Sequence, residues 1–234
     1  MGISKQKMNK YLLPYDIFER HNKIASYIKS HDTVADIGGE LNHLSQFCKP
    51  QKIIVANLNT GDVLISKNKL PFKNNSFDIV CSIDVLEHVP KNKRQDFINK
   101  LIDIAKKKVL LSFPIGTPKH NIYEKNIEKW LNKKGENVTY LKEHILYGLP
   151  EIEEIKKLTN NYNTIISFSG NIKINEMLFK VFMFDPKIKI LRKTIYFLKL
   201  FFNILTNNIF YLLLINRQFS QNINRVYVEI TKNI

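Results

Sequence analysis

Short apolar runs alternate with helical apolar stripes along the first half of the chain. Each run is bounded by polar residues, which is typical of a buried strand. The predicted strands are 33–37, 52–58, 76–84 and 108–113, with a weaker one at 62–65 at the sheet edge. The predicted helices are 16–29, 41–48 and 94–106. This alternation, with short connections, favours a parallel sheet with helices on both faces.

The pattern changes after Pro118. A polar helix is predicted over 121–134 and a second helix over 151–161, followed by a strand at 163–169. A long apolar and basic region comes next. The chain then reaches 225–231, which alternates like a strand with one wetter face.

Composition fits one globular domain. The 234 residues are 44% hydrophobic and 11% aromatic, which is enough for a sizeable core. Cys48 and Cys81 lie in apolar surroundings, so we expect reduced thiols rather than a disulfide. The N-terminal residues MGISKQK contain no apolar run, and we expect a cytoplasmic protein.

The net charge of +15 raises the question of nucleic-acid binding. Lys, Asn and Ile are abundant along the whole chain, which indicates a general compositional bias rather than one basic patch. Nucleic acid is therefore not the expected partner. The exception is the last fifth of the chain: from Pro186 onward there are eight basic residues and a single acid, Glu229, a net charge of +7.

The loop after the first strand reads DIGGELNHL. Gly38 and Gly39 permit a positive φ and let the backbone approach a ligand, and Asn42 tolerates the left-handed conformation. Glu40 would repel the pyrophosphate of a dinucleotide, and no GK[ST] step follows. A cofactor that has a ribose but no phosphate, such as S-adenosylmethionine, fits better. Asn57 ends the second strand, where a ribose-binding side chain is expected in such folds.

Four blocks in order carry a family resemblance: DIGGELNHL, IVANL, LPFKNNSFDIVCSIDVLEHVP and KKVLLSFPIG. They resemble the class I S-adenosylmethionine-dependent methyltransferases, in the branch called methyltransferase type 11. LKEHILYGLP is similar to a stretch found in a subgroup among glycan and cell-surface biosynthesis proteins. The resemblance covers roughly 15–170. It implies a Rossmann-like, doubly wound α/β sheet that is mostly parallel, with 225–231 as an antiparallel last strand.

The resemblance also implies roles for single residues. Asp36 would orient the cofactor's amine, Asn57 with Leu58 would hold the ribose, and Asp84 would close the strand that faces the methyl donor. Glu40 and Asn42, and an asparagine at 57 in place of the usual acid, depart from the family pattern. The predicted cofactor-binding residues are Asp36, Gly38, Gly39, Glu40, Asn42, Asn57, Leu58 and Asp84.

Methyl transfer is an in-line displacement that needs a general base only when the acceptor carries a proton. Asp84 and His88, at the carboxyl edge of the sheet, are the candidate catalytic residues; a capping or packing role for His88 is the alternative. Glu143 and His144 are a candidate substrate-side pair, with an ordinary surface pair as the alternative. No metal is expected. The other histidines show no metal-ligand spacing: His21, His31, His43 and His120.

The apolar stretch 195–215 has the length of a membrane span. We do not expect it to cross, because 225–231 should pair with the same sheet as 108–113. Lys199, Asn203 and Asn207 repeat every four residues and give a polar stripe. We expect either a helical lid or an interfacial helix pair, with the basic flank 187–193 suited to anionic lipid. The expected parts are one domain over 1–234, a core of 15–170 and 224–232, and an apolar helical insert at 171–223, of which 187–215 is the candidate peripheral membrane contact.

The sequence therefore predicts S-adenosylmethionine-dependent methyl transfer to a small molecule, a glycan or a lipid-linked acceptor. A non-catalytic accessory or binding protein of the same fold is the first alternative. An RNA or DNA methyltransferase is the second. It is disfavoured because no Asn/Asp-Pro-Pro-aromatic step is present to hold a base.

Overall fold

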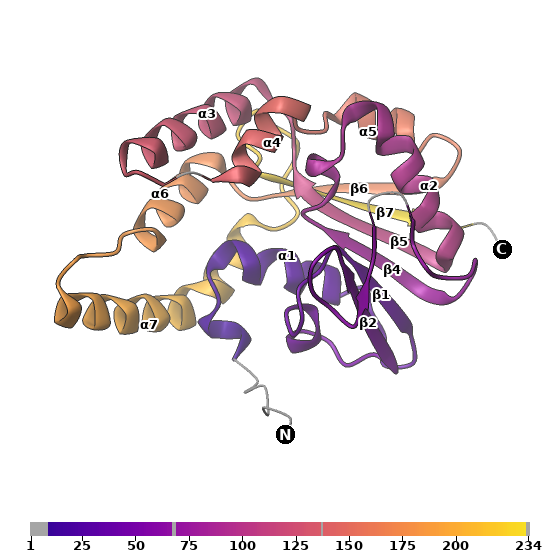
Figure 1. Cartoon of the computed structure of the whole chain (residues 1–234), viewed down its shortest axis with the longest axis horizontal. Helices are drawn as coiled ribbons and strands as arrows, with labels where there is room; N and C mark the ends of the chain where they lie inside the picture. The colour runs from indigo at the N-terminus through magenta and orange to yellow at the C-terminus, as the bar shows by residue number, and fades with distance from the viewer. Residues whose placement is uncertain (1–8, 67–68, 137, 233–234) are drawn as a thin grey trace.

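A computed structural model describes residues 9–66, 69–136 and 138–232. Its strands form one sheet in the order β3-β2-β1-β4-β5-β7-β6 (Figure 1). Neighbours from β3 to β5 are parallel, and β7 is antiparallel to both β5 and β6. The strands are β1 (Thr33–Ile37), β2 (Lys52–Asn57), β3 (Val63–Leu64), β4 (Phe77–Ile83), β5 (Ala105–Pro114), β6 (Asn163–Ser169) and β7 (Arg225–Thr231). The predicted fold class, with its antiparallel last strand, is confirmed.

Helices cover both faces of the sheet (Figure 1). The helices are α1 (Tyr15–Ala25), α2 (Arg94–Ile104), α3 (Pro118–Lys133), α4 (Thr139–Tyr147), α5 (Ile152–Leu158), α6 (Ile172–Phe182) and α7 (Lys189–Leu214). The described residues also form the 3₁₀ turns η1 (Lys10–Leu12), η2 (Leu44–Gln46), η3 (Leu86–His88) and η4 (Lys91–Lys93). Most predicted helices are present with bounds that differ by a few residues.

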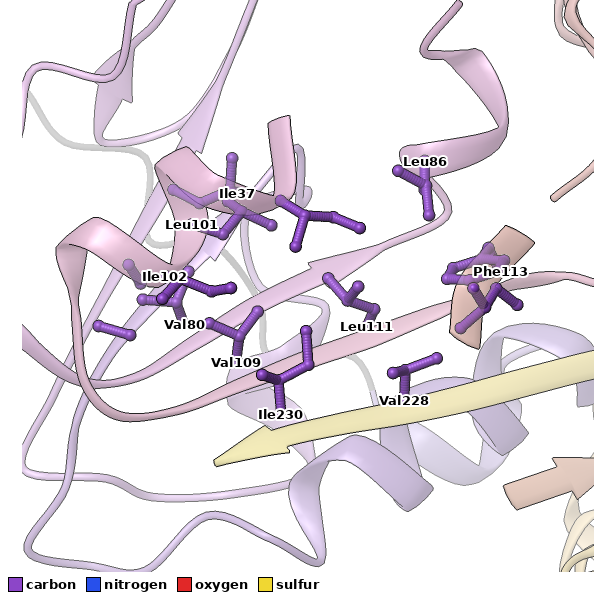
Figure 2. Close-up of a cluster of buried hydrophobic side chains, with 14 of the residues drawn as sticks. Ile37, Val80, Leu86, Leu101, Ile102, Val109, Leu111, Phe113, Val228 and Ile230 are labelled. Carbon is purple, nitrogen blue, oxygen red and sulfur yellow. The ribbon is translucent and has the colours of Figure 1, made fainter. Parts of the chain in front are cut away.

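The main core lies on one face of the sheet, under α2 and α5. Figure 2 shows Val109, Leu111 and Phe113 of β5 packing there with side chains of β4, β7 and α2. The intervening Leu110 points to the opposite face, where it packs with Ile24 of α1. Both faces of β5 are therefore buried, which explains why its sequence is a continuous apolar run instead of an alternating one.

The predicted helix at 41–48 was wrong. The structure has only the short turn η2 at Leu44–Gln46. Gly38 has a φ of +83° and Asn42 a φ of +67°, so the backbone leaves the right-handed region twice before the turn begins. Pro50 then stops any extension, and one turn is all that fits. The prediction that Asn42 is left-handed is confirmed.

Residues 172–214, which we call the helical arm, comprise α6, a connection and α7. α7 extends away from the sheet (Figure 1). By length and composition alone, α7 could cross a membrane. β7 follows α7 and pairs with β5, in the same sheet as expected, and it also pairs with β6. The amide of Gly170 donates to the carbonyl of Leu214 at 2.9 Å. The end of α7 therefore stays at the sheet.

The polar stripe of α7 faces the protein. The side-chain amide of Asn207 donates to the carbonyls of Leu13 (3.0 Å) and Tyr11 (3.2 Å) beside η1. Asn203 donates to the carbonyl of Leu12 at 3.0 Å, and the Lys199 ammonium donates to two carbonyls at the end of α6. The outer surface is apolar. Exposed residues of α7 include Ile190, Tyr196, Phe197, Phe201, Leu205 and Leu212. α7 is therefore amphipathic, but its polar side faces the protein and its apolar side faces outward, the reverse of an ordinary surface helix.

Candidate active site

Asp36 lies at the carboxyl end of β1 and is fully buried. Neither of its carboxylate oxygens has a hydrogen-bond partner among the described residues. Burial raises the pKa of Asp36 from 3.8 to about 7. A Cβ on Gly39 would lie 2.1 Å from the Asp36 carboxylate, and one on Gly38 would lie 2.3 Å from Val85. Only glycine fits at these two positions.

Asn57 ends β2 and holds this loop. Its side-chain amide donates to the carbonyl of Gly38 at 3.1 Å and to that of Gly39 at 2.8 Å. An aspartate could not make these bonds, because a carboxylate only accepts. Leu58 follows and is exposed. Glu40 is exposed as well, with a carboxylate oxygen 3.6 Å from His43 Nε2.

Asp84 follows β4 with a φ of +54°, beside the same edge of the sheet. Two arginines hold its carboxylate: Arg20 of α1 at 2.6 Å, and Arg225 of β7, which also donates to Ser112 Oγ at 3.2 Å. Burial would raise the pKa of Asp84, but the two guanidinium groups outweigh it and hold the pKa well below its usual range. An acid held this way is a poor proton acceptor and a good fixed anion.

The two arginines were not identified as site residues from the sequence. Arg20 lies on a helix that precedes the sheet, and Arg225 begins the last strand. Register places Arg225 opposite Pro114, at the edge where β5 ends. A signal was available for Arg225: it is a charged residue at the start of the predicted strand 225–231, the position that pairing with β5 brings to the edge of the sheet near Asp84.

The candidate catalytic residue His88 lies against the predicted substrate-side pair Glu143 and His144. His88 of η3 donates from Nδ1 to the Glu143 carboxylate of α4 at 2.7 Å. His144 donates from Nδ1 to the carboxylate of Glu124 on α3, also at 2.7 Å, and the Nε2 atoms of the two histidines are 3.4 Å apart. Burial, and then the neighbouring His144, lower the pKa of His88. Glu124 was not identified from the sequence.

Comparisons with known proteins agree with this fold. No curated protein sequence matches the chain. The structure is similar to a SAM-dependent methyltransferase from Thermotoga maritima, described as a possible histamine N-methyltransferase, with a TM-score of 0.54 at 13% identity over 96% of this chain and 92% of that one. A SAM-dependent methyltransferase from Archaeoglobus fulgidus gives 0.52 at 13% identity over 96% and 97%.

A third similar structure is phosphoethanolamine N-methyltransferase 2 of Haemonchus contortus in complex with S-adenosyl-L-methionine. Its TM-score is 0.52 at 15% identity, over 98% of this chain and 58% of that one. Identities this low show a shared fold. Residues 33–113, from β1 through most of β5, match the family model of the methyltransferase domain.

The Thermotoga and Archaeoglobus proteins are described as SAM-dependent methyltransferases, and the Haemonchus structure holds S-adenosyl-L-methionine. The loop after β1 fits that cofactor. Asp36 is a buried carboxylate without a partner, and an ammonium group is the ligand that such a carboxylate accepts best. The short turn η2 offers no long helix N-terminus for a phosphate, and Glu40 adds a negative charge there. Both features suit a cofactor without phosphate.

Proposed function

We propose that this protein is an S-adenosylmethionine-dependent methyltransferase and that its acceptor has a large apolar part, such as a lipid-linked small molecule or glycan. The observation that carries the proposal is an apolar cavity of about 580 Å³ between α1, α6 and α7. Its lining includes Ile17, Phe179, Ile195, Leu198 and Phe202. A hydrocarbon chain is the occupant that such a lining favours, because apolar burial is its main source of affinity.

Two consecutive ion pairs lead from the cavity wall to Asp84. Asp16 lies on the cavity wall, and its carboxylate is 3.3 Å from the Arg20 guanidinium. The same nitrogen of Arg20 is 2.6 Å from Asp84. An acceptor whose apolar part filled the cavity would therefore place its polar end near Asp84. In this arrangement Asp84 and its two arginines position ligands and do not remove a proton.

Bound S-adenosylmethionine would supply an electrophilic methyl group. Asp36 would hold its amine, Gly38 and Gly39 would pass close to its methionyl part, and Asn57 would keep these glycines in place. The domain's own contribution is then mainly alignment of the acceptor with the donor, which is the larger part of catalysis for an in-line displacement.

Two measurements test the proposed function. Calorimetry with S-adenosylhomocysteine should show one binding site, and absence of heat at high micromolar ligand would instead favour an accessory protein of this fold. Labelled methyl transfer into fractionated cell extract should place the label in the organic-solvent phase. Label confined to the aqueous phase would contradict the lipid-linked acceptor while leaving the methyltransferase assignment intact, and label in RNA or DNA would favour a nucleic-acid substrate.

We further propose that the helical arm lies on a membrane surface. The outward face of α7 is apolar, and the residues of its polar stripe bond to carbonyls of the protein. The start of α7 is flanked by four basic residues, Lys187, Lys189, Arg192 and Lys193. Apolar surface and adjacent basic residues are the two attractions that hold interfacial helices on anionic bilayers. Both ends of the arm remain at the domain, which favours a surface position over a crossing.

Changing those four basic residues to glutamine should reduce co-sedimentation of the protein with phosphatidylglycerol-containing vesicles. The binding free energy should weaken by about 1 kcal/mol for each residue that lies near the membrane surface. Serine at Phe201 and Leu212 should reduce it on neutral phosphatidylcholine vesicles too, because apolar area is lost. A matched control removes the same charge elsewhere, at Lys52, Lys91, Lys106 and Lys157. If this control pellets as poorly as the arm variant, the attraction is general and the proposed surface is wrong.

A further inference from the structure

Three metal-ligating side chains converge beside the candidate active site. Glu87 and His88 belong to η3, and His144 belongs to α4, which packs on that turn. One ligand atom of each residue lies within 4.8 Å of the other two. Glu87 and His144 are buried, at 1% and 6% exposure, and His88 is half-buried.

The two imidazoles are held so that they present lone pairs to each other. A carboxylate can only accept, so Glu143 fixes the proton of His88 on Nδ1, and Glu124 does the same for His144. Both Nε2 atoms then carry a lone pair, and they face one another at 3.4 Å. Two lone pairs at this distance repel unless a cation lies between them.

The separation suits a metal ion. Two imidazole nitrogens at 2.0–2.1 Å from a tetrahedral zinc ion lie about 3.3–3.4 Å apart. In metal sites the ligating histidine donates its other N–H to a carboxylate, which is what Glu143 and Glu124 provide. The third group, Glu87, has a buried Oε2 without a hydrogen-bond partner among the described residues. A buried carboxylate oxygen left in this way is a ready third ligand.

We propose that Glu87, His88 and His144 bind a divalent transition-metal ion, with zinc as the best match. Two imidazoles and one carboxylate favour Zn²⁺ over Mg²⁺ or Ca²⁺, which prefer oxygen ligands alone. Three protein ligands leave one tetrahedral position for water or another oxygen. The proposal departs from the sequence-based expectation of no metal, which considered spacing along the chain and not the contact between η3 and α4. It does not depend on methyl transfer.

The test is zinc titration of the full, tag-free chain after removal of metal by a chelator. One zinc ion per chain should bind, and cobalt in its place should give the visible absorption of a tetrahedral site. H88Q and H144Q should abolish both signals. E124Q and E143Q should weaken zinc binding by about 10- to 100-fold, because they act through the ligands. H31Q, an exposed histidine near Asp32, is the matched control and should bind like the parent.

Several results would overturn the proposal. The parent chain could bind no zinc, in which case a proton shared between the two imidazoles explains their approach. H88Q could also bind as tightly as H31Q, which would place the metal elsewhere. Circular dichroism of each variant separates lost binding from lost folding. Because His88 is half-buried, H88Q keeps the test informative even if H144Q fails to fold.

Discussion

Replacing Asp36 with asparagine should weaken S-adenosylhomocysteine binding by about 100-fold or more, because the cofactor's ammonium group loses its buried ionic partner. The same change should stabilise the cofactor-free protein near neutral and alkaline pH. In that state the Asp36 carboxylate is buried and has no hydrogen-bond partner among the described residues. If Asp36 binds the cofactor, D36N should weaken binding and raise stability. If Asp36 is a structural residue, D36N should not raise stability.

The sign of the pH dependence follows from the raised pKa. Folding moves the pKa of Asp36 from 3.8 to about 7, so the folded state prefers the protonated acid. Its destabilising effect begins as pH rises above the unfolded value and is complete above about 7, where it reaches ~4 kcal/mol. D36N should therefore gain stability relative to the parent between about pH 5 and pH 8. The gain will be smaller than the full figure, because the new amide is buried as well.

Calorimetry measures the binding, and thermal unfolding at the two pH values measures the stability. D78N is the matched control, because Asp78 of β4 is an acid in the same sheet that already has partners. Hydrogen bonds from Thr33 and an ion pair with Lys107 at 2.9 Å hold the pKa of Asp78 below its usual value. D78N should lose stability and keep cofactor affinity. If D36N behaves like D78N, Asp36 is a structural residue.

Replacing Arg94 with methionine should destabilise the protein by about 3–5 kcal/mol, the range for a buried ion pair that loses one partner. Arg94 is fully buried, and one terminal nitrogen is 3.0 Å from both oxygens of Glu154 on α5. It also donates to the carbonyl of Val89 at 3.1 Å and to that of Gly148. One side chain thus joins the segments after η3 and after α4.

Urea unfolding measures the loss, and R94K should recover little of it, since an ammonium cannot reproduce the planar fork. K156M is the control: Lys156 forms an exposed pair with Glu153 at 2.8 Å, and its loss should cost less than about 1 kcal/mol. Equal losses in R94M and K156M would contradict the central role of Arg94. R94M should also weaken zinc binding, because Arg94 holds the end of the helix that carries His144.

The sequence was most informative where structure is local. Apolar runs correctly predicted the strands, because a strand that is buried on both faces is apolar along most of its length. The failure at 41–48 has a local cause too: helical spacing was present, but left-handed backbone at Asn42 and the proline at 50 left no room for a helix. Helix α4 was not predicted, although Gly148, with a φ of +73°, ends it.

Only some residues of the candidate site could be predicted from the sequence. Asp36, Asp84, His88 and His144 lie in conspicuous blocks, so they could be chosen from local pattern. Their partners come from distant elements, and pairing over such separations is set by how the elements pack. The polar stripe of α7 is a similar case. Its four-residue repeat was readable, but its inward direction depended on the carbonyls of 11–13, which no periodicity reveals.

The position of β7 has a consequence for synthesis. β7 is made after the helical arm, yet it lies between β5 and β6 and joins them into one sheet. Until β7 has been made, β6 lacks the one strand that pairs with it in the part of the chain that the structure describes, and the apolar arm is attached to an incomplete sheet. Chains caught at this stage would expose strand edges and hydrocarbon together, a combination that promotes aggregation. A nascent chain that met a lipid surface at that moment would have its arm shielded before its sheet was closed.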